Sequence, residues 1–377
     1  MRVVIVGGGY AGLACALDLR KLAPRAELHL VDPGDAHVKQ TRLHEALHRP
    51  LADLRVPFSE LAGRYGFEHH RAALGDDAAF DAEALRTWHD DGAVPLAGER
   101  LACDYLVIAT GARPRLRAEA SSRVADQLIL REREGRAFVD SCLLEADGDA
   151  AGATIVGGGA SGVQYAFELA QVLRRRARGT PIRLIDSEDR LLSALPVSTH
   201  DYVAAQMQAA GISYLPRTAY LGQTSASLRV RHLDEDSEQS LPSALTLLFG
   251  GVEAYPFALR ANRYGQVVVD GKTLVRVFAA GDCARYAARG LDALTAQAAV
   301  RKGKHVAANI SRLHRGRPPV AYGFQELGYI VSMGSLDSVG WVLVRENIVR
   351  GAAATALRKV VEAQYDLFVD GLDTYIV

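Results

Sequence analysis

Hydrophobic side chains are arranged along this chain in two closely similar stretches, about 150 residues apart. Residues 3–6 and 153–156 are short apolar runs rich in β-branched side chains, and each leads into a glycine-rich turn. Apolar and polar positions then follow with helical spacing over residues 13–22 and 163–175. The pattern therefore predicts a strand, a tight turn and a helix, twice.

The first turn has the spacing Gly-x-Gly-x-x-Gly at Gly7, Gly9 and Gly12, which is the fingerprint of a dinucleotide-binding motif. The first glycine permits the tight turn, the second lets the backbone approach a pyrophosphate, and the third lets the helix pack closely on the strand. The pyrophosphate would lie at the helix N-terminus, where free N–H groups and the helix dipole favour an anion. Asp32 ends the next apolar run, 20 residues after Gly12, and would accept hydrogen bonds from ribose hydroxyls.

The second turn repeats this spacing at Gly157, Gly159 and Gly162, and Asp186 ends the following run 24 residues after Gly162. Either copy alone could be only a glycine-rich turn of an α/β fold. Two copies in the same context indicate a protein that holds two dinucleotides at once. A bound FAD and a diffusible nicotinamide are the usual pair, and electron transfer between them is the usual purpose.

Two further apolar runs, residues 105–112 and 277–284, end in small residues, which mark places where the backbone meets a ligand at the edge of a parallel sheet. We therefore expect an α/β fold with two Rossmann-like (two-dinucleotide-binding) domains, the second inserted in the first, plus a small C-terminal α+β domain. The expected boundaries are an FAD-binding domain at 1–115 and 245–320, an NAD(P)H-binding domain at 116–244 and a C-terminal domain at 321–377.

The last part of the chain has a different pattern. Residues 324–344 indicate several short strands, and residues 352–369 have helical spacing. We expect the apolar stripe of this helix to pack on its own sheet or on a second subunit rather than on a membrane. Its members are Leu357, Val360, Val361, Tyr365, Phe368 and Val369. Earlier in the chain, residues 228–241 predict a hairpin with an acidic exposed turn.

Composition narrows the class of protein. The 377 residues carry 44 basic and 44 acidic side chains, so nothing indicates nucleic acid as a partner. No apolar stretch reaches the roughly 18 residues that a membrane span needs, and the chain starts directly with a core strand. We expect a cytoplasmic protein, or one peripheral on the cytosolic face of a membrane. The widely spaced Cys15, Cys103, Cys142 and Cys283 favour neither structural zinc nor a close-spaced redox dithiol.

Taken together, these residues resemble the pyridine nucleotide–disulfide oxidoreductase superfamily, and within it the type II NADH:quinone oxidoreductases and the apoptosis-inducing-factor-like reductases. The resemblance covers nearly the whole chain. It rests on both fingerprints and on three further segments, residues 109–111, 280–282 and 294–299. It implies a flavoprotein in which FAD and NADH are bound together.

The resemblance also assigns roles to individual residues. The nicotinamide dinucleotide would be held by Gly157, Gly159, Gly162 and Asp186. Asp282 would accept from the ribityl or pyrophosphate region of FAD, and Ala296 with Gln297 would lie beside the isoalloxazine, where Gln297 is the candidate catalytic residue. The full set expected around FAD is Gly7, Gly9, Tyr10, Ala11, Gly12, Asp32, Thr110, Gly111, Gly281, Asp282, Ala296 and Gln297.

The chain also departs from this family. Gln164 stands where the quinone-reducing branch usually has Glu, which puts any carboxylate-dependent step in doubt, although Glu168 follows one helical turn later. Lys39 replaces a common aromatic residue. Lys39, Arg42 and His44 either shape a polar flavin entrance or lie on a charged surface helix. The long amphipathic membrane-anchoring tail of many quinone reductases is missing or minimal.

The expected reaction is hydride transfer from NADH to flavin, followed by transfer of two electrons to a quinone-like acceptor. NADPH is the less favoured donor, because the Asp186 carboxylate repels a 2′-phosphate, although Arg183 and Arg190 are near enough in sequence to blunt this effect. The alternatives are a reductase of a ferredoxin-type protein, a slow-turnover redox-sensing flavoprotein, and a flavoprotein of sulfide or disulfide chemistry. A homodimer through the C-terminal domain is the family habit.

Overall fold

The structure is a computed structural model, which describes residues 1–74, 80–96, 98–118, 123–145, 152–175, 179–224, 227–287 and 293–374. It divides into two compact units. The first unit comprises Met1–Lys39, Arg55–Arg113 and Val252–Glu326, and the second comprises Gln40–Leu54, Pro114–Gly251 and Leu327–Val377.

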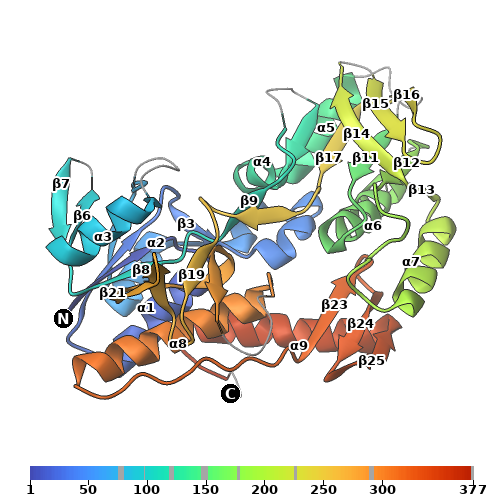
Figure 1. Cartoon of the computed structure of the whole chain (residues 1–377). Coiled ribbons are helices and arrows are strands. Elements are labelled where there is room, and N and C mark those ends of the chain that lie inside the picture. Colours follow the sequence, from blue (N-terminus) through green and yellow to red (C-terminus); the bar gives the residue numbers. More distant parts are fainter. Residues whose placement is uncertain are drawn as a thin grey trace. The chain divides into compact units, whose positions relative to one another are not determined.

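An eight-stranded sheet forms the centre of the first unit (Figure 1). Its strands, in spatial order, are β22 (Ala284–Tyr286), β19 (Leu259–Ala261), β20 (Gln266–Val269), β21 (Lys272–Ala279), β8 (Tyr105–Ile108), β1 (Arg2–Val6), β2 (Glu27–Val31) and β5 (Glu68–His70). The five strands from β21 to β5 are parallel to one another. Parallel strands place their carboxyl ends at one edge, so the turns after β1, β8 and β21 meet there.

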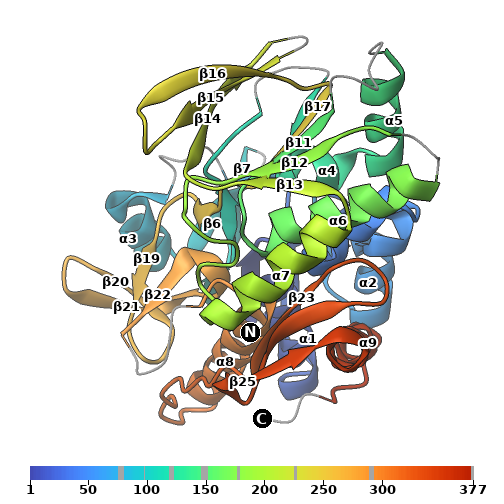
Figure 2. The same ribbon diagram turned by 90° about the vertical axis from the view of Figure 1, so that its right-hand side faces the viewer.

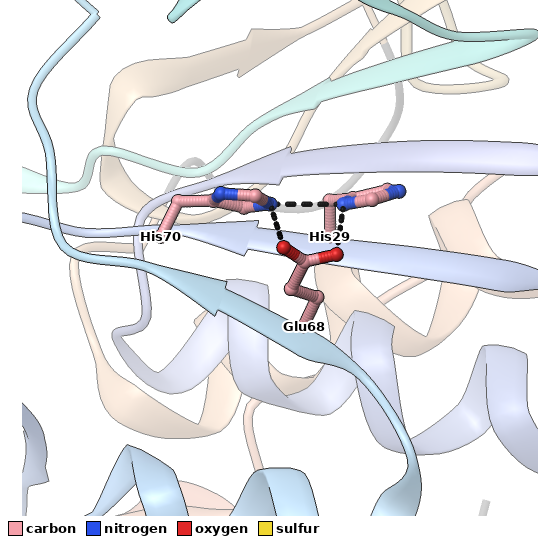
Figure 3. Close-up of side chains that lie close together, drawn as sticks. All are labelled: His29, Glu68 and His70. Carbon is pink, nitrogen blue, oxygen red and sulfur yellow. Dashed lines mark hydrogen bonds and ion pairs between the residues drawn. The ribbon is translucent and has the colours of Figure 1, made fainter. Parts of the chain in front are cut away.

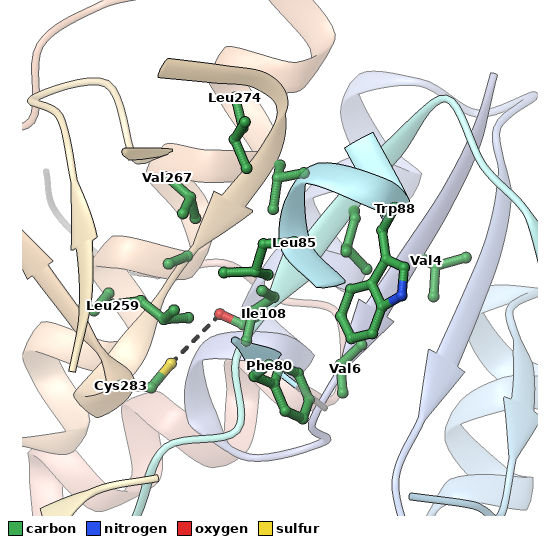
Figure 4. Packing of buried hydrophobic residues seen from close by; sticks show 14 of the residues in the cluster. Val4, Val6, Phe80, Leu85, Trp88, Ile108, Leu259, Val267, Leu274 and Cys283 are labelled. Atoms are coloured by element: carbon green, nitrogen blue, oxygen red, sulfur yellow. Dashed lines mark hydrogen bonds between the residues drawn. The ribbon is translucent and has the colours of Figure 1, made fainter. Parts of the chain in front are cut away.

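Helices cover this sheet because their apolar stripes need burial. Helix α1 (Tyr10–Leu22) packs against α8 (Ala296–His314), and Gly303 of α8 permits the approach, since a Cβ there would lie 2.2 Å from the Ala11 carbonyl oxygen. A second helix, α3 (Ala82–Asp91), contributes to the buried core of this unit. Figure 4 shows its Leu85 and Trp88 side chains packed among hydrophobic side chains from the strands. The remaining elements are β3 (Ala36–Val38), β4 (Arg55–Pro57), α2 (Phe58–Tyr65), β6 (Ala93–Leu96), β7 (Glu99–Ala102), β9 (Ala112–Pro114), β18 (Val252–Ala254) and the short helix η4 (Gly281–Cys283).

A five-stranded, wholly parallel sheet forms the centre of the second unit (Figure 2). Its order is β10 (Val124–Asp126), β17 (Leu245–Leu248), β11 (Ala153–Val156), β12 (Ile182–Ile185) and β13 (Ile212–Leu215). The expected hairpin is confirmed as β15 (Ser227–His232) and β16 (Ser237–Pro242), with β14 (Thr218–Gln223) alongside. The helices are η1 (Gln40–Leu47), η2 (Leu51–Leu54), α4 (Gln127–Glu132), α5 (Gly135–Glu145), α6 (Ala160–Arg175) and α7 (Val197–Ala209).

The domain boundaries differ from those expected. We expected the chain to return to the first domain at residue 245, but β17 pairs with β10 and β11, so the return comes at Val252. Residues 40–54 group with the second unit because η1 packs against α6. Residues 327–377 also belong to the second unit rather than forming a separate one.

The C-terminal segment is a three-stranded antiparallel sheet with one long helix, as its pattern indicates. Strands β23 (Gly328–Ser332), β24 (Ser338–Val342) and β25 (Val344–Arg350) are followed by α9 (Gly351–Val369), which packs on β24. The apolar stripe of α9 is buried only at its end, at Tyr365, Phe368 and Val369. Leu357, Val360 and Val361 are 41%, 66% and 56% exposed, so these three do not pack on the sheet, and packing on a second subunit stays a prediction for them. Among the helices described, none is long and apolar enough to cross a lipid bilayer.

Candidate dinucleotide sites

The first fingerprint turn follows β1 and has the geometry that its glycines predict. Gly7 has φ +103°, and a Cβ on it would lie 2.3 Å from the Ala109 carbonyl oxygen. A Cβ on Gly12 would lie 1.8 Å from the Gly7 carbonyl oxygen, which is the close contact of helix on strand. Gly9 is different, because no described atom lies within 4 Å of its added Cβ. The space beside Gly9 is therefore the open side of the turn, where a pyrophosphate would lie.

Helix α1 begins in this open space. Gly9 is its N-cap residue and supplies no side-chain cap, while the Gly9 carbonyl accepts from the Leu13 amide at 2.9 Å. The N–H groups of a helix's first turn have no acceptor within the helix itself, so the start of α1 suits an anion. Gly281 comes from the other end of the sequence and lies against this turn, since its added Cβ would be 2.9 Å from the Ala11 Cβ. The structure thus brings together two predicted segments that are 270 residues apart in the sequence.

Asp32 is held in place by backbone amides. One carboxylate oxygen accepts from the Gly8 amide at 2.7 Å and the other from the Gly34 amide at 2.7 Å. Two residues that sequence reasoning missed support the same turn. The buried His37 donates from Nδ1 to the Gly8 carbonyl at 3.0 Å, and the Phe58 ring lies where a Gly8 Cβ would be. Their apolar neighbours in the sequence gave no sign of these contacts, which are made across the fold.

Thr110 and Gly111 form the turn after β8. The Thr110 hydroxyl donates to the Tyr255 carbonyl at 2.5 Å, and the Tyr255 amide donates to the Gly111 carbonyl at 3.0 Å. Gly111 has φ +77°, a conformation that glycine adopts without strain. The turn is therefore fixed against the segment that re-enters the first unit, and it faces the same sheet edge as Gly7.

Asp282 lies in η4, directly after β21, and its carboxylate is incompletely satisfied. Its Oδ1 atom is buried and forms no hydrogen bond within the described part of the chain. Burial raises the pKa of Asp282 to about 6, against the opposing effects of the Lys302 and Arg285 charges. A buried carboxylate oxygen without a donor is costly unless a ligand supplies one. The hydroxyl groups of a ribityl chain are such donors, so the residues here fit FAD.

Lys302 is a second residue that sequence reasoning missed. It is 1% exposed, and its ammonium donates to the Ala284 carbonyl at 2.8 Å and the Gly281 carbonyl at 3.4 Å. It therefore fixes the turn that carries Asp282. A signal was present in the sequence, since Lys302 is four residues from both Ala298 and Val306 on the buried face of α8.

Ala296 and Gln297 occupy the first turn of α8, as expected. Thr295 caps this helix, because its hydroxyl accepts from the Ala298 amide at 3.2 Å. Gln297 is half-buried, so its amide is presented at the helix start rather than enclosed in the core. Ala296, Gln297 and Asp282 all belong to the first unit.

The second fingerprint has nearly the same backbone conformation as the first. Gly157 has φ +104°, and the Cβ of a residue at Gly162 would lie 1.8 Å from the Gly157 carbonyl oxygen. Beside Gly159 there is again no described atom within 4 Å of an added Cβ. The Asp186 carboxylate accepts from the Gly158 amide at 2.7 Å and the Glu188 amide at 3.2 Å. The two turns thus share one conformation and one carboxylate arrangement, as two separate nucleotide sites would.

The two arginines near Asp186 in the sequence are occupied elsewhere. Arg190 donates to the Ser193 carbonyl at 2.6 Å and the Leu195 carbonyl at 3.1 Å. The Arg183 guanidinium lies 3.2 Å from the Cβ that a side chain at Gly152 would have, beside the opposite, amino-terminal end of β11. Within the residues described, neither forms an ion pair with the Asp186 carboxylate, so its negative charge is not neutralised by either.

Gln164 is part of a polar cluster within the second unit. Its amide donates to the Ser332 hydroxyl at 3.4 Å, and that hydroxyl bonds the His44 Nε2 atom at 3.0 Å. His44 is 2% exposed, and burial lowers its pKa to about 3, so the imidazole is neutral. Glu168, one turn after Gln164, is buried and pairs with His48 Nδ1 at 3.1 Å.

His44 and Arg42 therefore do not lie on an exposed charged helix, and the alternative of a polar flavin entrance stays a prediction. Arg42 pairs with Glu45 at 3.1 Å and with Asp366 of α9 at 3.1 Å, in the interior of the second unit. The charged helix η1 faces α9 and α6 rather than solvent. Lys39 is half-buried at the end of the first segment of the first unit.

All four cysteines are free and buried. Burial raises the pKa of Cys103 to about 11 and also raises the pKa of Cys15 and Cys283. The Cys283 thiol faces the carbonyls of Ala280 at 3.3 Å and Ile108 at 3.5 Å (Figure 4). Since the thiolate is the reactive form, these environments favour packing roles over sulfide or disulfide chemistry.

Comparison with known proteins places this arrangement in a family. The family described as pyridine nucleotide-disulphide oxidoreductase matches residues 1–303. The chain belongs to this family. The resemblance inferred from the two fingerprints is confirmed, and the protein is an oxidoreductase.

Individual family relatives span nearly the whole chain. Demethylphylloquinone reductase of Synechocystis is 29% identical over 90% of this chain and 86% of its own length. A type II NADH:quinone oxidoreductase of Staphylococcus saprophyticus is 22% identical over 96% and 94%. Among solved structures, the sulfide:quinone oxidoreductase of Aquifex aeolicus has a TM-score of 0.77 at 19% identity, covering 99% of this chain and 92% of that one. NDH2 of Plasmodium falciparum in complex with NADH has a TM-score of 0.77 at 13% identity, covering 97% and 94%. These two structures confirm the expected α/β fold.

Proposed function

We propose that this chain is an FAD-dependent NADH dehydrogenase that reduces a quinone. The observation that carries the proposal is the pair of matched turns, each with an open glycine, an unobstructed helix start and an amide-bound carboxylate. Relatives named as quinone reductases over most of their length support the acceptor. When bound, FAD and NADH supply hydride transfer and the onward passage of two electrons.

The first unit holds FAD. Gly9 and the start of α1 take the pyrophosphate, and Asp32 accepts from the adenosine ribose. Asp282 is the acceptor for a ribityl hydroxyl, because its buried Oδ1 lacks a donor among the described residues. Lys302 keeps that turn in place through two carbonyls. Binding at the pyrophosphate, the ribose and the ribityl chain would orient the flavin, and orientation of reacting groups can supply roughly 7–11 kcal/mol of a reaction barrier.

The second unit holds NADH. Gly159 and the start of α6 take its pyrophosphate, and Asp186 accepts from the 2′-hydroxyl of the adenosine ribose. A 2′-phosphate would meet the Asp186 carboxylate, with which neither Arg190 nor Arg183 pairs among the described residues. Discrimination against NADPH therefore follows from like-charge repulsion and a lost hydrogen bond.

Gln297 is the residue that we assign to the acceptor. Its half-buried amide at the start of α8 can donate to a quinone carbonyl and accept from a quinol hydroxyl. An amide has no proton to release at neutral pH, so Gln297 binds and orients the acceptor. Gln164 likewise cannot act as an acid, and its amide is committed to Ser332.

Anaerobic stopped-flow absorbance tests this function. The flavoprotein is mixed with NADH or NADPH, and in a second mixing step with a soluble quinone or ferricyanide. We expect fast bleaching by NADH and fast reoxidation by quinone. Gln297→Trp should slow quinone reoxidation while leaving bleaching by NADH unchanged, and Gln208→Trp, at an exposed position of α7, is the control. Slow reoxidation of the unaltered protein by every small acceptor would move the function to a protein acceptor or to redox sensing.

Although the sequence pattern favoured a sheet or a second subunit, we further propose that the exposed part of the α9 stripe contacts the cytosolic face of a membrane, where a lipid-soluble quinone would be found. Val360 and Val361 are more than half exposed, and Leu357 adds to the same face. Flotation with liposomes tests this, with Val360→Asp as the disrupting variant. Unchanged flotation combined with a shift from dimer to monomer on size exclusion would assign the face to a homodimer instead.

A further inference from the structure

Two histidines and a glutamate that have no role in the sites described above come together at the edge of the first unit (Figure 3). His29 lies on β2, and Glu68 and His70 lie on the edge strand β5. Glu68 is the direct partner of His29 in the parallel register, and His70 follows two residues later. A spacing of two puts all three side chains on one face of the sheet.

The separations of the ligand atoms match those around a small metal ion. His29 Nδ1 is 2.9 Å from His70 Nε2 and 3.5 Å from a Glu68 oxygen, and His70 Nε2 is 3.7 Å from the other Glu68 oxygen. One ligand atom from each of the three residues lies within 4.8 Å of the other two. A tetrahedral Zn²⁺ with bonds of about 2.0–2.2 Å keeps its ligand atoms about 3.3 Å apart. Small side-chain rotations therefore suffice to place one ion between the three.

Glu27 completes the arrangement from the other side of His29. Its carboxylate lies 3.3 Å from His29 Nε2, so the imidazole carries its proton there and turns the Nδ1 lone pair toward His70 and Glu68. A carboxylate that fixes the tautomer of a ligating histidine is a regular part of protein metal sites. His29 is 4% exposed and thus rigidly placed, while Glu68 is an exposed residue that leaves a route from solvent.

We propose that His29, Glu68 and His70 bind one divalent first-row transition ion of the Zn²⁺ class, with Glu27 as the orienting carboxylate. Two imidazoles and one carboxylate are a ligand set that zinc accepts, with water in the fourth position. On binding, the ion replaces the proton that lies between His29 Nδ1 and His70 Nε2. If the His70 ring is neutral, this proton moves to its Nδ1 atom. If the ring is charged, Nδ1 already carries a proton and the displaced one passes to solvent.

The site also adjoins the flavin-binding edge through the backbone. The Asp32 amide donates to the His70 carbonyl at 3.1 Å, so the last ligand and the ribose carboxylate share one backbone hydrogen bond. An ion that ties the edge strand β5 to β2 would stabilise this edge. Because the ligands lie outside both nucleotide sites, metal binding does not depend on the proposed quinone reduction.

The test uses the full-length flavoprotein without a polyhistidine tag, cleared of metal by EDTA and dialysis. Equilibrium dialysis against ZnCl₂ should give one tightly bound ion per chain, and Co²⁺ should give the visible absorption of a tetrahedral site. Glu68→Gln and His70→Asn should weaken Zn²⁺ binding by more than the roughly 10–100-fold that loss of an orienting residue costs. Glu27→Gln should fall within that range. Zn²⁺ should raise the unfolding temperature of the unaltered protein and not that of Glu68→Gln.

His89→Asn is the matched control. His89 pairs with Asp90 at 2.8 Å on the surface of the same unit but belongs to no three-ligand group among the described residues, so its loss should leave Zn²⁺ binding unchanged. Glu68 is exposed, and retained flavin absorbance would show that Glu68→Gln is folded. The proposal is overturned if the unaltered protein binds no stoichiometric Zn²⁺. It is equally overturned if Glu68→Gln and His70→Asn bind the ion as tightly as His89→Asn does.

Discussion

Replacing Asp282 by Asn should stabilise the flavin-free protein and weaken its hold on FAD. Burial raises the pKa of Asp282 from 3.8 to about 6. Below pH 3.8 the carboxyl is protonated in both the folded and the unfolded chain, so it carries no penalty. Above pH 6 it is ionised in both, and the folded state bears the full cost of about 3 kcal/mol. Asn has nearly the same shape and never ionises, so the variant should escape this cost.

Flavin binding should change in the opposite direction. A hydrogen bond to a charged acceptor contributes about 1.5–3 kcal/mol, so its loss should raise the Kd for FAD by roughly 10–150-fold. The Asn oxygen still accepts, which places the expected effect toward the lower end. The two halves of the prediction are separate measurements on one variant.

The assay is urea unfolding of the apoprotein between pH 4 and pH 8, together with quenching of FAD fluorescence on binding. The free-energy difference between Asp282→Asn and the unaltered chain should be near zero at pH 4, rise through pH 5 and level off above pH 6. A difference that is flat across this range would refute the assignment of a buried, donor-deficient carboxylate. An unchanged Kd for FAD would show that Asp282 does not face the flavin.

Further predictions concern the glycines, the donor preference and acid stability. Gly9→Ala should fold normally yet bind FAD weakly, because its methyl group fills only ligand space, whereas Gly12→Ala should lose stability on thermal denaturation through its 1.8 Å clash with a backbone carbonyl. Asp186→Ser should bring the kcat/KM for NADPH toward that for NADH, and an unaltered ratio in steady-state assays would contradict the assigned role. Burial lowers the pKa of His44 to about 3, so its contribution to stability should be present above pH 6.5 and be lost as the pH falls toward 3. Urea unfolding of His44→Gln should show a weaker dependence on pH in that window.

Much of the fold could be predicted because its signals are local. The strand, turn and helix around each fingerprint depend on β-branched runs and on glycines at fixed spacing, and both copies form as predicted. The position of β17 could not be predicted in the same way. Residues 245–248 form an apolar run, and nothing in the run indicates which sheet it joins. Its pairing with β10 and β11 is decided by tertiary packing.

The residues of the candidate sites also differ in how far the sequence could predict their positions. Asp32 and Asp186 could be placed from their distance to a glycine, since the carboxylate and the turn lie on adjacent strands. His37 and Phe58 could not, because they reach the first turn from a separate small sheet and from α2. The contact between His29 and His70 could not be predicted either. It depends on the register of two parallel strands whose paired residues are 39 positions apart in the sequence. The sequence shows which residues are present in each strand but not how the two strands are aligned.

The interrupted connectivity of the two units sets an order for events during synthesis. All five strands of the second sheet have been synthesised once Leu248 is added. The first sheet must still wait for β19, β20, β21 and β22, and α1 must wait for α8, whose Gly303 lies against Ala11. At translation rates of about 5–20 residues per second, the first helix is exposed for roughly 15–60 s before its partner exists. The nascent chain therefore presents an apolar helix and an incomplete flavin cradle to chaperones throughout most of its synthesis, and FAD can be captured only near the end.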